Sequence, residues 1–200
     1  MTEADEVEDL YFAYGPDMDP AVLRARGGRP EAVAVARLSD YKLAFFGYAE
    51  TWDSGMETVV PDPGGEVWGV VYRLRPWDWD NLDVWMDARL DGAGMYFHYP
   101  AEVVDLSGKT HSVRFYKKNC QGEPRLPSVP YLDLVVGGAG QQGLPIKYVE
   151  RLRCTVAHKP AFPVPVPGNP DRGVIVKADC GACEAAEVDS ELVEEEVEIC

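Results

Sequence analysis

Short runs of β-branched, aromatic and aliphatic residues recur along this chain, and turn-forming residues separate them. The runs lie at residues 10–14, 32–36, 41–46, 57–60, 67–74, 95–104 and 111–116. Each has the length and composition of a β-strand. The segment 61–65 reads Pro-Asp-Pro-Gly-Gly and predicts a turn between two of them. A chain with this pattern is built largely of strands.

Three helices are expected among these strands. Asp19 can cap a helix that starts at Pro20 and stops before Gly27. A second starts at Pro76, and its apolar residues fall on one face: Trp79, Leu82, Met86 and Leu90. Four carboxylates repeat this spacing one residue later and form a stripe beside that face: Asp80, Asp83, Asp87 and Asp91. A third helix is expected over 145–152. The fold class predicted is therefore α+β.

The formal net charge of -15 is concentrated at the two ends of the chain. Residues 1–9 contribute -5 and residues 177–200 contribute -8, which leaves -2 for the body. A nearly neutral body has no basic stripe for nucleic acid. No apolar run has the roughly 18 residues that a membrane-spanning helix needs, and the N-terminus is acidic where a signal peptide is basic. We therefore expect a cytoplasmic protein with neither a nucleic-acid nor a membrane partner.

Composition divides the chain into four parts. An acidic leader at 1–9 precedes a single domain at 10–158. A proline-rich, extended linker follows at 159–176, and an acidic, cysteine-containing tail occupies 177–200. The tail holds Cys180, Cys183 and Cys200, which are weak candidates for a metal site because a closed zinc site takes four ligands. We expect no metal and no cofactor.

The strongest motif follows the first predicted strand, where residues 11–18 read YFAYGPDM. Further fragments follow in order: VARL at 35–38, DYKL at 40–43, VWGVVY at 67–72, LD at 82–83, GMY at 94–96, PS at 127–128 with Tyr131, and GLP at 143–145. Their sequence and order resemble the γ-glutamylcyclotransferase family, also called AIG2-like, over residues 10–152. The resemblance implies a small barrel of mixed strands with flanking helices, either monomeric or homodimeric.

The resemblance also implies a reaction. In this family the α-amine of a small γ-glutamyl compound attacks its own γ-carbonyl, so that 5-oxoproline forms and the attached amine leaves. The reaction needs donors for the developing oxyanion and a group that moves a proton. The loop of Tyr14, Gly15, Pro16, Asp17 and Met18 is expected to bind the substrate, although Pro16 has no N–H to offer where the family usually has serine.

The proton-moving group is expected near the end of the second helix. The family places a glutamate in an LDxxEG stretch, and Met86 occupies that position here. Asp87 is the nearest carboxylate and the candidate base, while the competing interpretation puts all four aspartates of the stripe on a solvated face. Tyr96, Ser128 and Tyr131 match residues that line the family's pocket.

Three functions follow from these observations. The first is a cyclotransferase in which Asp87 is the displaced base. The second is a binding protein that kept the pocket and lost the chemistry, because Met86 and Pro16 both alter functional positions. The third places the function in the tail, through capture of a metal or a partner by its cysteines.

Overall fold

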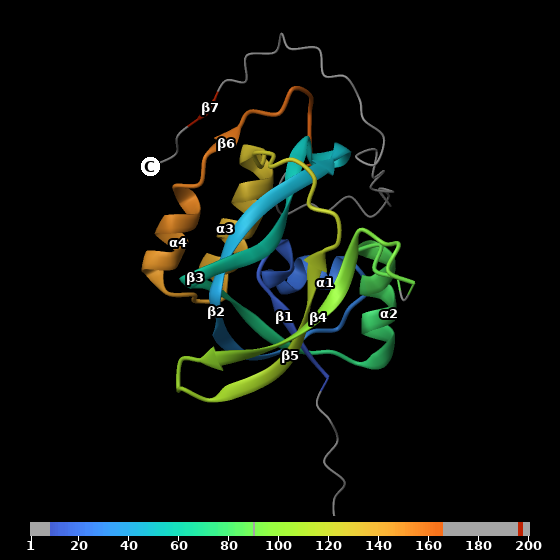
Figure 1. Cartoon of the computed structure of the whole chain (residues 1–200), viewed down its shortest axis with the longest axis vertical. Coiled ribbons are helices and arrows are strands. Elements are labelled where there is room, and N and C mark those ends of the chain that lie inside the picture. The colour runs from blue at the N-terminus through green and yellow to red at the C-terminus, as the bar shows by residue number, and fades with distance from the viewer. Residues whose placement is uncertain (1–8, 90, 166–195, 198–200) are drawn as a thin grey trace, which may run out of the picture.

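The computed structural model describes residues 9–89, 91–165 and 196–197. Five strands form a closed barrel in the order β1-β3-β2-β4-β5. They are β1 (Leu10–Ala13), β2 (Glu31–Ala49), β3 (Ser54–Arg73), β4 (Tyr96–Asp105) and β5 (Thr110–Lys118). The barrel is mixed because β1 runs parallel to β5 and antiparallel to β3. The predicted fold class, a mixed barrel with flanking helices, is confirmed (Figure 1).

The two longest strands differ from the sequence prediction. Each was expected as two shorter runs, but β2 and β3 form one long antiparallel hairpin. The segment 61–65, predicted as a turn, lies inside β3, so that prediction was wrong. Its turn residues make a bulge, since Ser39 pairs with Glu66 while Tyr41 pairs with Pro61. The bulge is closed by Gly64 N–H, which donates to the Asp40 side chain at 2.9 Å.

Short helical elements connect and cover the strands. A 3-10 turn, η1 (Pro16–Met18), leads from β1 into α1 (Pro20–Ala25), and the Asp19 side chain accepts the Ala21 N–H at 2.7 Å as a cap. The second helix, α2 (Pro76–Trp85), ends earlier than its apolar periodicity predicts. The expected third helix is confirmed as α4 (Ile146–Arg153). Figure 1 shows α2 on one side of the barrel and the pair α3–α4 on the other.

Helix α3 (Val129–Gln141) was not expected from the sequence. Its second half contains Gly137, Gly138 and Gly140, and glycine disfavours a helix interior. Tertiary packing explains one of them, because a Cβ on Gly138 would lie 3.0 Å from the Asp19 nitrogen and 3.2 Å from the Met18 Cβ. The glycine lets η1 approach α3 closely, which brings the loop after β1 against this helix.

Two apolar clusters form the core. One consists of strand residues, including Phe12, Val71 and Phe115, together with Tyr14 from the loop after β1, and therefore fills the barrel. The other joins alternate strand residues such as Tyr72 to helix residues such as Leu82 and Leu132. The barrel is thus packed on the inside and covered by helices on the outside, as the alternation of side chains along its strands requires.

Most of the two acidic ends lies outside the described residues. This holds for the predicted leader at 1–9, the linker at 159–176 and the tail at 177–200 with Cys180, Cys183 and Cys200. A short sheet pairs β6 (Ala157–His158) with β7 (Glu196–Val197). Among the helices in the described ranges, none is both long and apolar enough to cross a bilayer. The described residues contain no group of three or more side chains suited to a metal ion.

Candidate active site

The loop after β1 is buried and presents unused backbone donors. All of its residues from Tyr14 to Met18 are buried. The Met18 N–H donates to the Gly15 carbonyl at 3.0 Å and closes the 3-10 turn. The N–H groups of Gly15 and Asp17 donate to no acceptor within the described part of the chain. They flank Pro16, so two donors remain in the loop in spite of the proline.

A carboxylate from β3 lies directly against this loop. Glu57 is 7% exposed, and a Cβ built on Gly15 would lie 2.3 Å from its Oε1 atom. Only a glycine leaves room for the carboxyl group at this point. The bend at Gly15 and Pro16 therefore has an acid beneath it, but the acid comes from a strand of the hairpin and not from α2.

Two tyrosines from different elements fix Glu57. The Tyr131 hydroxyl, on the first turn of α3, donates a hydrogen bond to Glu57 Oε2. The Tyr96 hydroxyl, at the start of β4, donates to the Glu57 backbone carbonyl at 3.1 Å. Both tyrosines were predicted as site residues from the sequence, and the structure brings both to the same glutamate.

The electrostatics of Glu57 are those of a buried acid. Burial raises the pKa of Glu57 above its ordinary value, while the hydrogen bond from Tyr131 and the positive charge of Arg26 oppose that rise. Burial, together with the Glu57 charge, raises the pKa of Tyr131 well above its ordinary value. Tyr131 therefore stays protonated as a donor, and Glu57 is an acid whose proton is held more tightly than on a surface glutamate.

A second carboxylate and a cation complete the cluster. Asp17 is 3% exposed and accepts a hydrogen bond from the Tyr11 hydroxyl at 2.8 Å. Its other oxygen is 2.7 Å from Nη1 of Arg26, the residue that caps the end of α1. Arg26 Nη1 also lies 3.7 Å from the sulfur of Met86. Met86 stands where the family resemblance places a glutamate. The Arg26 guanidinium is therefore contacted there by a neutral thioether and not by a carboxylate.

The structure places Asp87 apart from this cluster. Asp87 is exposed, has a positive φ of 43° just after α2, and accepts the Met95 N–H on Oδ2 at 3.2 Å. Asp80 and Asp91 are also exposed, and Asp83 binds the Tyr116 hydroxyl and His98 instead. No hydrogen bond or ion pair in the described ranges joins Asp87 to the loop at 14–18. Asp87 acts here as a turn residue that shapes the entry into β4.

The remaining predicted residues have supporting positions. Ser128 is fully buried, donates its hydroxyl to the Trp52 carbonyl at 2.6 Å, and precedes the first residue of α3. It therefore anchors the helix that carries Tyr131. Met18 is buried in the core, and its carbonyl accepts the Tyr72 hydroxyl at 2.6 Å. The Tyr14 hydroxyl donates to the Tyr116 carbonyl.

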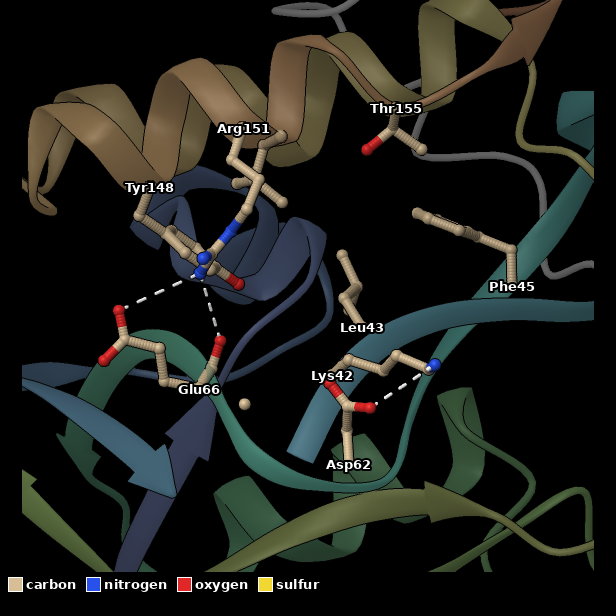
Figure 2. A pocket seen from close by; sticks show the side chains of 10 residues that line it. Lys42, Leu43, Phe45, Asp62, Glu66, Tyr148, Arg151 and Thr155 are labelled. Atoms are coloured by element: carbon tan, nitrogen blue, oxygen red, sulfur yellow. Dashed lines mark hydrogen bonds and ion pairs between the residues drawn. The ribbon is translucent and has the colours of Figure 1, made fainter. Parts of the chain in front are cut away.

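A separate pocket lies between the long hairpin and α4. It has a volume of about 250 Å³ and shares no residue with the Glu57 cluster. Figure 2 shows its charged side chains paired with one another: Lys42 with Asp62 at 3.5 Å, and Arg151 with the Glu66 carboxylate at 3.9 Å. Because these charges compensate each other, the pocket offers no single strong group for catalysis.

Sequence reasoning missed Glu57 and Arg26. Glu57 stands in a run predicted as a strand, two positions before the buried Val59, so period-two alternation puts both on one face. A lone acid at an inward position of an apolar strand is a signal that could have identified it. Arg26 carries no such signal, since it follows a short helix and only the fold places it beside Asp17.

Comparisons with known proteins identify the family and agree with the fold. Residues 66–152 match the model of the AIG2-like family. A γ-glutamylcyclotransferase from Homo sapiens is 34% identical over 158 residues, which cover 76% of this chain and 81% of the human protein. One from Bos taurus is 34% identical over 72% of this chain and 76% of its own length. A solved structure of a γ-glutamyl cyclotransferase superposes with a TM-score of 0.72 at 31% identity, covering 78% of this chain and 93% of its own.

Proposed function

Because this chain belongs to the γ-glutamylcyclotransferase family, we propose that it is a cyclotransferase in which Glu57, and not Asp87, moves the proton. The observation that carries this proposal is the Glu57 carboxyl group, buried against Gly15 and hydrogen-bonded by Tyr131. The chain thus retains an acid at the loop even though Met86 stands where the family resemblance expects one.

The cluster has the parts that cyclisation needs. The neutral α-amine of a γ-glutamyl group forms a bond to its own γ-carbonyl carbon, and Glu57 accepts the proton that this amine loses. The bond from that carbon to the attached amine then breaks, and Glu57 returns the proton to the departing nitrogen. The products are 5-oxoproline and the free amine. A raised pKa suits Glu57 to both steps, because the group must take up a proton and release it again.

The loop supplies the stabilisation of negative charge. During attack the γ-carbonyl oxygen becomes an oxyanion, which needs preorganised donors. The unpaired N–H groups of Gly15 and Asp17 are the donors that the loop offers. Tyr131 keeps the Glu57 carboxylate in one orientation, so the base does not have to reorganise during the reaction.

The decisive experiment compares Glu57→Gln with Asp87→Asn. The wild type is incubated with a panel of γ-glutamyl amines and γ-glutamyl dipeptides, and 5-oxoproline is quantified by mass spectrometry. Loss of a general base costs about 10²- to 10⁴-fold in kcat, so Glu57→Gln should fall by that factor. Asp87→Asn should stay within about twofold of the wild type, because the Asp87 side chain is exposed and its one hydrogen bond to a described residue is with the Met95 N–H. Circular dichroism checks that both variants are folded.

Two results would overturn the proposal. Turnover that survives in Glu57→Gln and is lost in Asp87→Asn would restore Asp87 as the base. If the wild type bound γ-glutamyl compounds but gave no 5-oxoproline from any of them, the chain would be a ligand-binding member of the family. That second function is the one that the thioether at Met86 favours.

The cellular location, the size of the substrate and the oligomeric state are further parts of the proposal. We propose that the protein acts in the cytoplasm on a small γ-glutamyl compound, as a monomer or homodimer, and without a nucleic-acid partner. Fractionation of cells and light scattering of the purified protein test the location and the oligomeric state.

A further inference from the structure

Arg26 is a cation held in place at the loop that also contacts the candidate base. Its Nη1 donates to Asp17, which is itself held by Tyr11. The guanidinium carbon lies 5.7 Å from the centre of the Trp85 ring. These contacts come from η1, β1 and the end of α2, so the position of the guanidinium is set by three elements.

Much of the donor capacity of Arg26 is unused. Its acceptors among the described residues are the Asp17 carboxylate and the Met86 sulfur, and both contact Nη1. The N–H groups on Nε and Nη2 have no acceptor there, and the side chain is 20% exposed. An arginine with free, planar donors in a largely buried site is suited to a carboxylate ligand.

The charges around the loop match the head group of the proposed substrate. A γ-glutamyl group carries an α-carboxylate and an α-amine on the same carbon atom. Arg26 and Glu57 contact the same short loop, because Arg26 binds Asp17 and Glu57 lies against Gly15, two residues earlier in the chain. A carboxylate bound at Arg26 would therefore direct the neighbouring amine toward Glu57. Met86 adds no competing negative charge beside the guanidinium.

We propose that Arg26 binds the α-carboxylate of the substrate and makes the site specific for γ-glutamyl groups. The proposal rests on the proposed function, and it adds the substrate-recognition residue for that reaction. Under it, a γ-aminobutyryl amide, which has the same chain and amine but no α-carboxylate, is a poor substrate because it cannot use Arg26.

The test measures both substrates with the same leaving amine. Arg26→Lys keeps a positive charge beside Asp17 but loses the planar pair of donors. It should raise KM for the γ-glutamyl amide about tenfold to a hundredfold, as expected for the loss of charged hydrogen bonds, with a smaller change in kcat. Any turnover of the γ-aminobutyryl amide should change by less than about twofold. Arg24→Lys, at an exposed position of α1 just before Arg26, is the matched control and should leave both substrates unaffected.

Binding provides a readout that does not depend on turnover. Calorimetry with Glu57→Gln should detect 5-oxoproline more strongly than 2-pyrrolidinone, which lacks the carboxylate. Adding Arg26→Lys to Glu57→Gln should remove that difference. Met86→Glu places a carboxylate next to the guanidinium and should weaken 5-oxoproline binding, whereas Met86→Gln should not.

The outcomes separate this inference from the proposed function. Absence of 5-oxoproline from the wild type would reject the proposed function. Normal wild-type turnover combined with an equal effect of Arg26→Lys on both substrates, or equal binding of 5-oxoproline and 2-pyrrolidinone, would reject the role of Arg26 alone.

Discussion

At the scale of single residues, the site depends on the close approach of Gly15 to Glu57. Gly15 belongs to the loop after β1, and Glu57 lies near the start of β3, close to the turn of the long hairpin. They meet with no space for a methyl group between them. Glycine is thus needed here for room, since its φ of -116° is one that other residues adopt. Glu57 is 7% exposed at this contact, and its burial raises its pKa.

Gly15→Ala should therefore damage both stability and activity. The new Cβ would lie 2.3 Å from Glu57 Oε1, so the carboxyl group must move and its bond to Tyr131 must break or distort. We expect a loss of about 1–3 kcal/mol in the free energy of unfolding and a large fall in kcat. Urea denaturation and the 5-oxoproline assay measure the two effects.

Gly137→Ala is the control for this substitution. Gly137 lies inside α3, and nothing would be within 4 Å of an added Cβ. Because alanine favours a helix interior, this variant should be as stable as the wild type or up to about 1 kcal/mol more stable. Equal behaviour of the two alanine variants would contradict the packing described for Gly15.

At the scale of elements, the start of α2 is tied to the loop after α1 by one buried acid. Asp78 is fully buried and accepts the N–H groups of Arg75 at 3.0 Å and Arg29 at 3.2 Å. The first bond caps α2, and the second joins it to the segment that follows Arg26. Asp78 thus links α2, which ends at Trp85, to the segment that contains Arg26.

Asp78→Ala should destabilise the protein by about 1–3 kcal/mol, because it removes the fully buried carboxylate that accepts both backbone N–H groups, one of which caps α2. Asp80→Ala, on the exposed face of the same helix, should change stability by less than about 0.5 kcal/mol. Urea denaturation of both variants measures the difference. Similar losses in the two would show that Asp78 has no special role in holding α2.

At the scale of the whole molecule, one buried acid makes stability depend on pH. The pKa of Glu57 is raised in the folded protein because the carboxyl group is buried, whereas in the unfolded chain it returns to about its ordinary value of 4.5. Between these two values the folded state holds a proton that the unfolded state has lost. Folding is therefore favoured below the ordinary pKa, and this contribution disappears as the pH rises through the folded value.

Glu57→Gln removes this dependence and keeps an acceptor for Tyr131. The free energy of unfolding of the wild type should fall relative to that of the variant as the pH rises from below 4.5 toward neutrality. Denaturation curves of both proteins across that range measure the difference. A difference that stays constant with pH would mean that Glu57 is not held with a raised pKa.

Local patterns in the sequence were enough to predict the class of fold, the family and most of the loop. Strand-forming runs, the cap at Asp19 and the motif at 11–18 are local signals, and each depends on neighbours along the chain. Tyr96 and Tyr131 were predicted in the same way, from motif matches. Such local signals cannot show which strand faces the loop. The sequence therefore predicted the base at Asp87, which follows Met86, the residue at the family's glutamate position.

Which acid reaches the loop depends on how distant segments of the chain pack together. The long hairpin brings Glu57 under Gly15, and helix α3, which its glycines conceal in the sequence, brings Tyr131 to the same carboxyl group. The bulge at 61–66 and the end of α2 at Trp85 likewise follow from pairing and packing between distant segments. A site made by closing a barrel joins residues far apart in the chain, and its geometry exists only once the strands have paired.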